Sequence, residues 1–96
     1  MHAFNNKDYW VVPQSLLEDK SLSLGTKVLY SYLRTCAWER LTVSKQRREI
    51  RDALNMTFLT LDKDLKILEA EGYLTIDKID RNYLKITFNK KNGRSI

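Results

Sequence analysis

The chain has 96 residues, of which 43% are hydrophobic, with three glycines and one proline, a composition that fits one folded domain with a modest core and argues against disorder. It contains no apolar run near the roughly 18 residues of a membrane-spanning helix and no apolar signal core at its amino terminus, so we expect a cytoplasmic protein with no membrane partner. Seventeen Lys and Arg residues against 12 Asp and Glu give a net charge of +5, and a small basic domain attracts polyanions.

The amino-terminal part is predicted to contain a flexible lead-in, a short strand and one helical turn. Residues 1–8 are mostly polar and form the lead-in. Residues 9–12 are aromatic and β-branched, which is typical of a strand. Pro13 suits the first position of a helical turn that reaches Leu17.

A first core helix is predicted over residues 24–36, with Ser23 as its N-cap. Lys27, Ser31 and Arg34 are expected on its polar faces. Its apolar row at helical spacing consists of Val28, Leu29, Tyr32, Leu33 and Cys36. Cys36 is the only cysteine and is interpreted as a buried structural thiol. Trp38, which follows the helix, is expected to pack over the edge of the core.

A pair of helices is predicted next. After a short strand at residues 41–43, Ser44 is the expected N-cap of a helix whose buried face contains Ile50, Ala53 and Leu54. Asn55 ends this helix, because asparagine tolerates the left-handed conformation of a tight turn.

The second helix of the pair is predicted to begin after the N-cap Thr57 and to end at Gly72. Its buried stripe at i, i+4 and i+7 is formed by Leu61, Leu65 and Leu68. Its carboxylates, including Asp62/Asp64 and Glu69/Glu71, are expected on a solvated face.

A β-hairpin is predicted to follow the second helix. Residues 73–76 begin its first strand, and Leu84, Ile86 and Phe88 alternate with polar residues along its second. Residues 80–82 form the turn, and residues 90–96 are a basic tail.

The spacing from Val43 to Leu74 resembles that of the winged helix-turn-helix superfamily of DNA-binding proteins. The earlier run, from Val12 to Leu33, is similar to the opening of the helix-turn-helix domains of plasmid and phage replication initiators. The resemblance implies an α+β fold: a single winged helix-turn-helix domain over residues 9–89, with three core helices, a small antiparallel sheet and a carboxy-terminal wing hairpin. Such initiators usually carry further domains, and this sequence contains no origin-melting or ATPase segment.

We therefore expect double-stranded DNA binding, in replication initiation or transcriptional regulation on a mobile element. Free N–H groups near the start of the first helix of the pair are expected to bind phosphate. The outward face of the second helix is expected to lie in the major groove, although it lacks the Arg, Asn and Gln residues that usually read bases. The candidate DNA contacts are Ser44, Lys45, Gln46, Arg47, Arg48, Thr57, Phe58, Leu59, Asp62, Lys63, Lys66, Lys78 and Arg81.

A second interpretation stays open: the domain is a protein-interaction or oligomerisation module in a replication complex. An exposed Phe58 and Leu59 fit such a contact, and a homodimer or other replication proteins are partners to consider. Catalysis is not expected, because His2 is the only histidine and no metal-ligand cluster or glycine-rich phosphate loop is present. We expect no metal and no cofactor.

Overall fold

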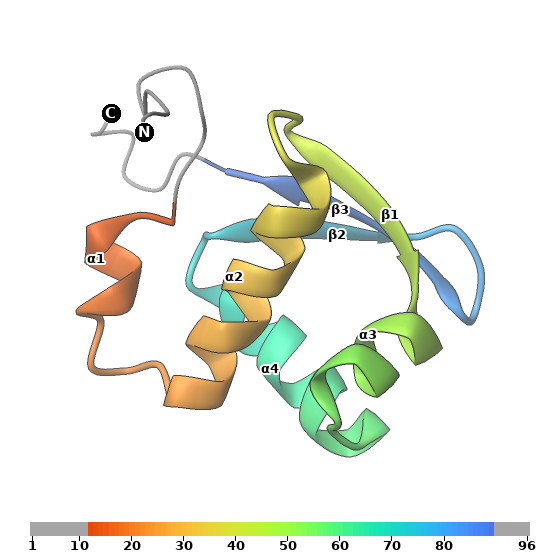
Figure 1. Ribbon diagram of the computed structural model, residues 1–96, viewed down its shortest axis with the longest axis horizontal. Coiled ribbons are helices and arrows are strands. Elements are labelled where there is room, and N and C mark those ends of the chain that lie inside the picture. Colours follow the sequence, from red (N-terminus) through yellow and green to blue (C-terminus); the bar gives the residue numbers. More distant parts are fainter. Residues whose placement is uncertain (1–11, 90–96) are drawn as a thin grey trace, which may run out of the picture.

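An antiparallel sheet and a set of helices form an α+β domain in the computed structural model, which describes residues 12–89 (Figure 1). The predicted lead-in, most of the predicted strand at residues 9–12 and the basic tail lie outside these residues. The elements are, in chain order, α1 (Gln14–Leu17), α2 (Leu24–Ala37), β1 (Thr42–Gln46), α3 (Arg47–Leu54), α4 (Phe58–Ala70), β2 (Leu74–Lys78) and β3 (Tyr83–Phe88).

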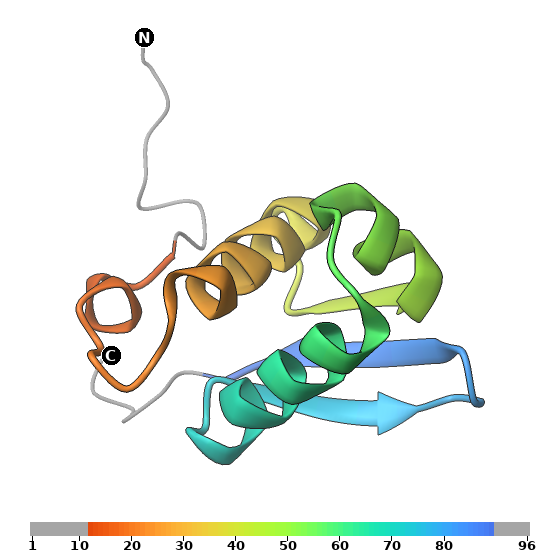
Figure 2. The same ribbon diagram turned by 90° about the horizontal axis from the view of Figure 1, so that it is seen from below.

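The sheet has the strand order β1-β3-β2, so the hairpin strand β3 lies in the centre. Ile86 of β3 is opposite Val43 of β1 on one side and Ile76 of β2 on the other. Figure 1 shows α2 crossing in front of the sheet, and Figure 2 shows α4 running beside the β2–β3 hairpin. The predicted hairpin is confirmed, with Asp80 accepting hydrogen bonds from the backbone N–H groups of Asn82 and Tyr83 in its turn.

The core lies between α2, α4 and the sheet. The predicted stripe of α4 is confirmed, because Leu61, Leu65 and Leu68 are all buried. The predicted alternation of β3 is confirmed as well, with its apolar residues inside. Two of the three predicted serine and threonine caps exist: Ser23 accepts from the N–H of Thr26, and Thr57 accepts from the N–H of Thr60.

The buried face of α2 differs from the predicted one. Val28 is 47% exposed, whereas Tyr30 and Arg34 are buried. The reason is that α2 meets both the sheet and α4, so its contact surface is rotated toward Tyr30, whose ring packs edge-on against those of Tyr73 and Phe88.

Arg34 is buried with its charge satisfied by the backbone. Its guanidinium donates to the carbonyl oxygens of Arg40, at 3.1 Å, and Trp38, and lies 4.4 Å from the ring centre of Phe88. Burial lowers its pKa below the usual arginine value. Arg34 therefore holds the turn after α2, where Trp38 has a positive φ of 59° and is 60% exposed instead of packing over the core. Cys36 is half-buried, not fully buried as predicted.

The boundary between β1 and α3 also differs from the prediction. Ser44 does not cap α3, because pairing with β3 continues to Gln46, opposite Tyr83. The backbone N–H of Arg47 then donates to the carbonyl of Asn82 at 2.7 Å, and Gln46 becomes the N-cap. At α1, Pro13 occupies the N-cap position and not the first helical position.

Two side chains in the helix pair lie on a different side from the predicted one. Ala53 is exposed, and Asp64 is only 4% exposed although a solvated face was predicted. Asp64 accepts a hydrogen bond of 2.9 Å from the Thr26 hydroxyl at the start of α2, where the free N–H groups of a helix favour a negative charge.

Candidate nucleic-acid interface

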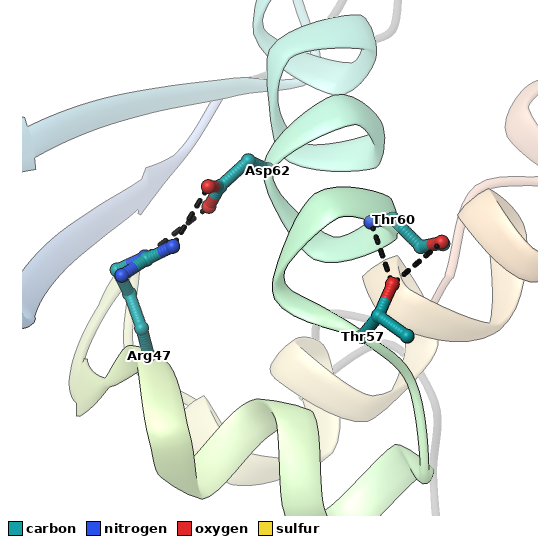
Figure 3. A network of polar contacts seen from close by, with 4 residues as sticks. All are labelled: Arg47, Thr57, Thr60 and Asp62. Atoms are coloured by element: carbon teal, nitrogen blue, oxygen red, sulfur yellow. Dashed lines mark hydrogen bonds and ion pairs between the residues drawn. The ribbon is translucent and has the colours of Figure 1, made fainter.

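Helices α3 and α4 are joined by a tight turn whose geometry follows from Asn55. This residue adopts the predicted left-handed conformation, with φ 53°, and the N–H of Met56 donates to the carbonyl of Arg51. Thr57 then caps α4 through the backbone and hydroxyl of Thr60 (Figure 3). The turn thus sets the angle at which α4 leaves α3.

The outward face of α4 is the one predicted. Leu59, Lys63, Lys66 and Ala70 are exposed, at successive turns of one helix face. Leu59 is 82% exposed. The face therefore presents one apolar group followed by two cations.

Arg47 and Asp62 are paired with each other across α3 and α4. Arg47 Nη2 lies 2.7 Å from Asp62 Oδ2, and Arg47 Nε donates to Oδ1 at 3.2 Å (Figure 3). The Arg47 side chain is only 19% exposed, and its backbone N–H is bonded to Asn82 in the hairpin turn. Arg47 therefore connects α3, α4 and the hairpin, which is a structural use for a residue predicted to contact DNA.

Phe58 is half-buried, whereas the sequence suggested an exposed ring. The guanidinium of Arg47 lies 4.3 Å from its ring centre and that of Arg51 lies 4.5 Å from it, distances typical of cation–π contacts. Phe58 is thus held by two cations at the first residue of α4.

Arg51 is absent from the candidate DNA contacts predicted from the sequence. It lines a hollow of about 350 Å³, together with Gln46, Arg48, Phe58 and Asn82. The signal that could have found it is its spacing from Arg47, since residues four apart share a helix face. Because Asn82 belongs to the hairpin turn, the exposed Arg48 lies next to that turn.

A groove of about 260 Å³ separates α4 from the hairpin, with Lys66 on one wall and Lys78 on the other. The acids that line it are engaged: Asp62 with Arg47, and Glu69 with the backbone N–H of Ile76 at 3.2 Å. With Arg47 and Asp62 paired, Lys66 and Lys78 face the single carboxylate of Glu69, so the charge of the residues lining the groove is positive by one. Arg81 is exposed at the tip of the hairpin beside it.

Ser44 and Lys45 are not brought together with the other candidates. Ser44 lines a separate hollow beside Cys36 and Arg40. Lys45 lies over Tyr32 of α2, 6.0 Å from its ring centre. Burial, with a hydrogen bond to Cys36, raises the pKa of Tyr32 to about 12, so this ring stays neutral at physiological pH.

Among residues 12–89, no group of three or more His, Cys, Asp or Glu side chains has a metal-binding arrangement. None of the helices in this part of the chain is long and apolar enough to cross a bilayer. Comparisons with protein-family models, with curated proteins and with solved structures find no significant match for the chain.

Proposed function

We propose that this chain is a winged helix-turn-helix domain that binds double-stranded DNA, with α4 as the helix in the major groove and the β2–β3 hairpin as the wing. The observation that carries the proposal is the grouping of exposed cations around α4 and the hairpin: Lys66 of α4 shares a groove with Lys78 of β2, and Arg48 of α3 shares a hollow with Asn82 of the hairpin turn. Such a grouping suits contacts with the phosphates that border a groove.

The order of the elements supports the same proposal. A helix, a strand, a capped helix pair and a hairpin follow one another, and the strands take the order β1-β3-β2. The resemblance to replication initiators favours a non-enzymatic role in replication initiation or transcriptional regulation on a mobile element, in the cytoplasm. In this proposal the Asp62 carboxylate keeps the guanidinium of Arg47 away from phosphate.

The test is a fluorescence-polarisation titration with a random 24-base-pair duplex at several salt concentrations. Arg48→Ala and Arg81→Ala are each expected to weaken binding to every duplex, because each removes one phosphate contact. The slope of the logarithm of the association constant against the logarithm of the salt concentration should become shallower by about 1 in each variant. Both side chains are exposed, so the melting temperature should stay the same. Arg40→Ala, an exposed arginine after α2, is the matched control and should keep the wild-type slope. Wild-type slopes in both test variants would leave these cations as ordinary surface charge.

Asp62→Asn is expected to strengthen DNA binding several-fold at low salt. The change removes a negative charge from the proposed interface and releases the guanidinium of Arg47, now 2.7 Å from the carboxylate, toward phosphate. The same titration, with Glu39→Gln as control, measures this effect. Glu39 is also an exposed acid, but it follows α2 and lines the separate hollow beside Cys36. Weaker binding by the Asp62 variant would show that the ion pair is needed to orient α4.

A second candidate function, a protein-interaction module, is favoured by one observation. Leu24 is 78% exposed and Val28, one turn further along α2, is 47% exposed. Sedimentation of the free protein distinguishes the candidates: a self-associating chain that fails to bind duplex DNA at low salt would support the second.

A further inference from the structure

The exposed leucine at the start of α4 stands out among the groups on the proposed DNA-binding face. Leu59 is 82% exposed, the highest value among the large hydrophobic residues identified as exposed in residues 12–89. It lies one turn before Lys63 on the same face of α4. Covering this apolar side chain with an apolar partner would remove it from water, which is favourable.

The polar side chains around Leu59 are bonded to one another. The hydroxyl of Thr57 is 3.1 Å from that of Thr60, and the Asp62 carboxylate is held by Arg47 (Figure 3). A carboxylate on a reading helix would otherwise accept from the amino group of cytosine. The start of α4 therefore presents one highly exposed apolar side chain, Leu59, among polar groups that are already hydrogen-bonded within the protein.

The partner that fits an apolar contact inside a basic face is the C5-methyl group of thymine, the apolar group that the major groove displays. We propose that Leu59 is a specificity-determining residue that contacts a thymine methyl group, so that the domain prefers sites with A·T pairs facing the start of α4. Lys63 and Lys66, on the same face, supply the attraction to the phosphates on which this contact depends. The inference rests on the proposed DNA binding.

The experiment compares two 24-base-pair DNA duplexes. In one, adenine alternates with thymine, and in the other, adenine alternates with uracil. Uracil lacks only the methyl group and keeps the hydrogen-bonding edges of thymine. The wild-type protein is expected to bind the thymine duplex about fourfold more tightly for each methyl group covered, the ratio that corresponds to burying one carbon group. In Leu59→Ala this ratio should fall to about one.

Leu24→Ala is the matched control. Leu24 is 78% exposed, against 82% for Leu59, and it also lies at the beginning of a helix, α2 instead of α4. The Leu24 variant should therefore keep the wild-type ratio of affinities for the two duplexes. Both leucines are exposed, so a melting curve should find both variants folded.

The possible failures are distinguishable. If the wild-type protein binds both duplexes with equal, salt-dependent affinity, the methyl contact is overturned and DNA binding stays in place. The same holds if the preference for thymine survives in Leu59→Ala. Failure of the wild-type protein to bind either duplex at low salt would overturn the proposed function and this inference with it.

Discussion

Leu61→Ala is expected to lower the free energy of unfolding by about 3 kcal/mol, within the range of about 2–5 kcal/mol seen when a buried leucine is truncated and leaves a cavity. Leu61 is completely buried at the start of the α4 stripe, where α4 packs against α2. Urea denaturation followed by circular dichroism gives the free energy of unfolding and its dependence on denaturant.

The control for this change is Leu59→Ala, two residues earlier on the same helix. It removes the same atoms from a side chain that is 82% exposed, so its effect on the free energy of unfolding should stay within about 0.5 kcal/mol. Equal losses in the two variants would mean that the face of α4 turned to the core had been assigned wrongly.

The double change Lys63→Ala and Lys66→Ala is expected to have the largest effect on DNA binding. If each lysine contacts one phosphate, the salt slope becomes shallower by about 2, and the lost counterion release alone weakens binding roughly sixtyfold at 0.1 M salt. Both lysines are exposed on the outward face of α4, so the fold should be retained. Polarisation titrations over a range of salt concentrations measure slope and affinity together.

The charge-matched control is Lys20→Ala with Arg40→Ala. Both residues are exposed, one before α2 and the other after it, and removing them lowers the net charge by the same amount. A similar loss of slope and affinity in this control would show that total charge, and not its placement on α4, governs binding. An unchanged slope in the Lys63/Lys66 variant would exclude α4 as a DNA-contacting helix and favour the protein-interaction candidate.

Much of the helix pair and the hairpin was predictable from sequence because its signals are local. Asn55 adopts its left-handed turn, Thr57 caps α4, and Gly72, with φ 87°, follows the end of that helix. Each of these positions is decided by the backbone preferences of one residue and its neighbours. The spacing of the α4 leucines at i, i+4 and i+7 likewise predicted that Leu61 is buried and Lys63 exposed.

The candidate site was predictable only in its outline. The exposed cations of α4 and of the hairpin lie where the pattern predicted them. The pairing of Arg47 with Asp62 was not predictable, because the two residues are 15 positions apart and meet only after α3 and α4 have packed together. The partial burial of Phe58 was not predictable for the same reason, because the two guanidiniums that cover its ring come from α3.

The sequence by itself determined the elements that depend on local periodicity, caps and turn residues: the α4 stripe, the hairpin, the end of α3 and both ends of α4. Only the tertiary structure decided which polar groups are buried or engaged. Arg34 is buried because Phe88 and two backbone carbonyls of the following turn surround it. Asp64 is buried because α2 begins beside it, and β1 extends past Ser44 because β3 pairs with it as far as Tyr83, opposite Gln46. In the first two cases the physical reason is that a buried polar group must be satisfied by partners. In the third it is backbone pairing with a strand that only the folded chain brings alongside.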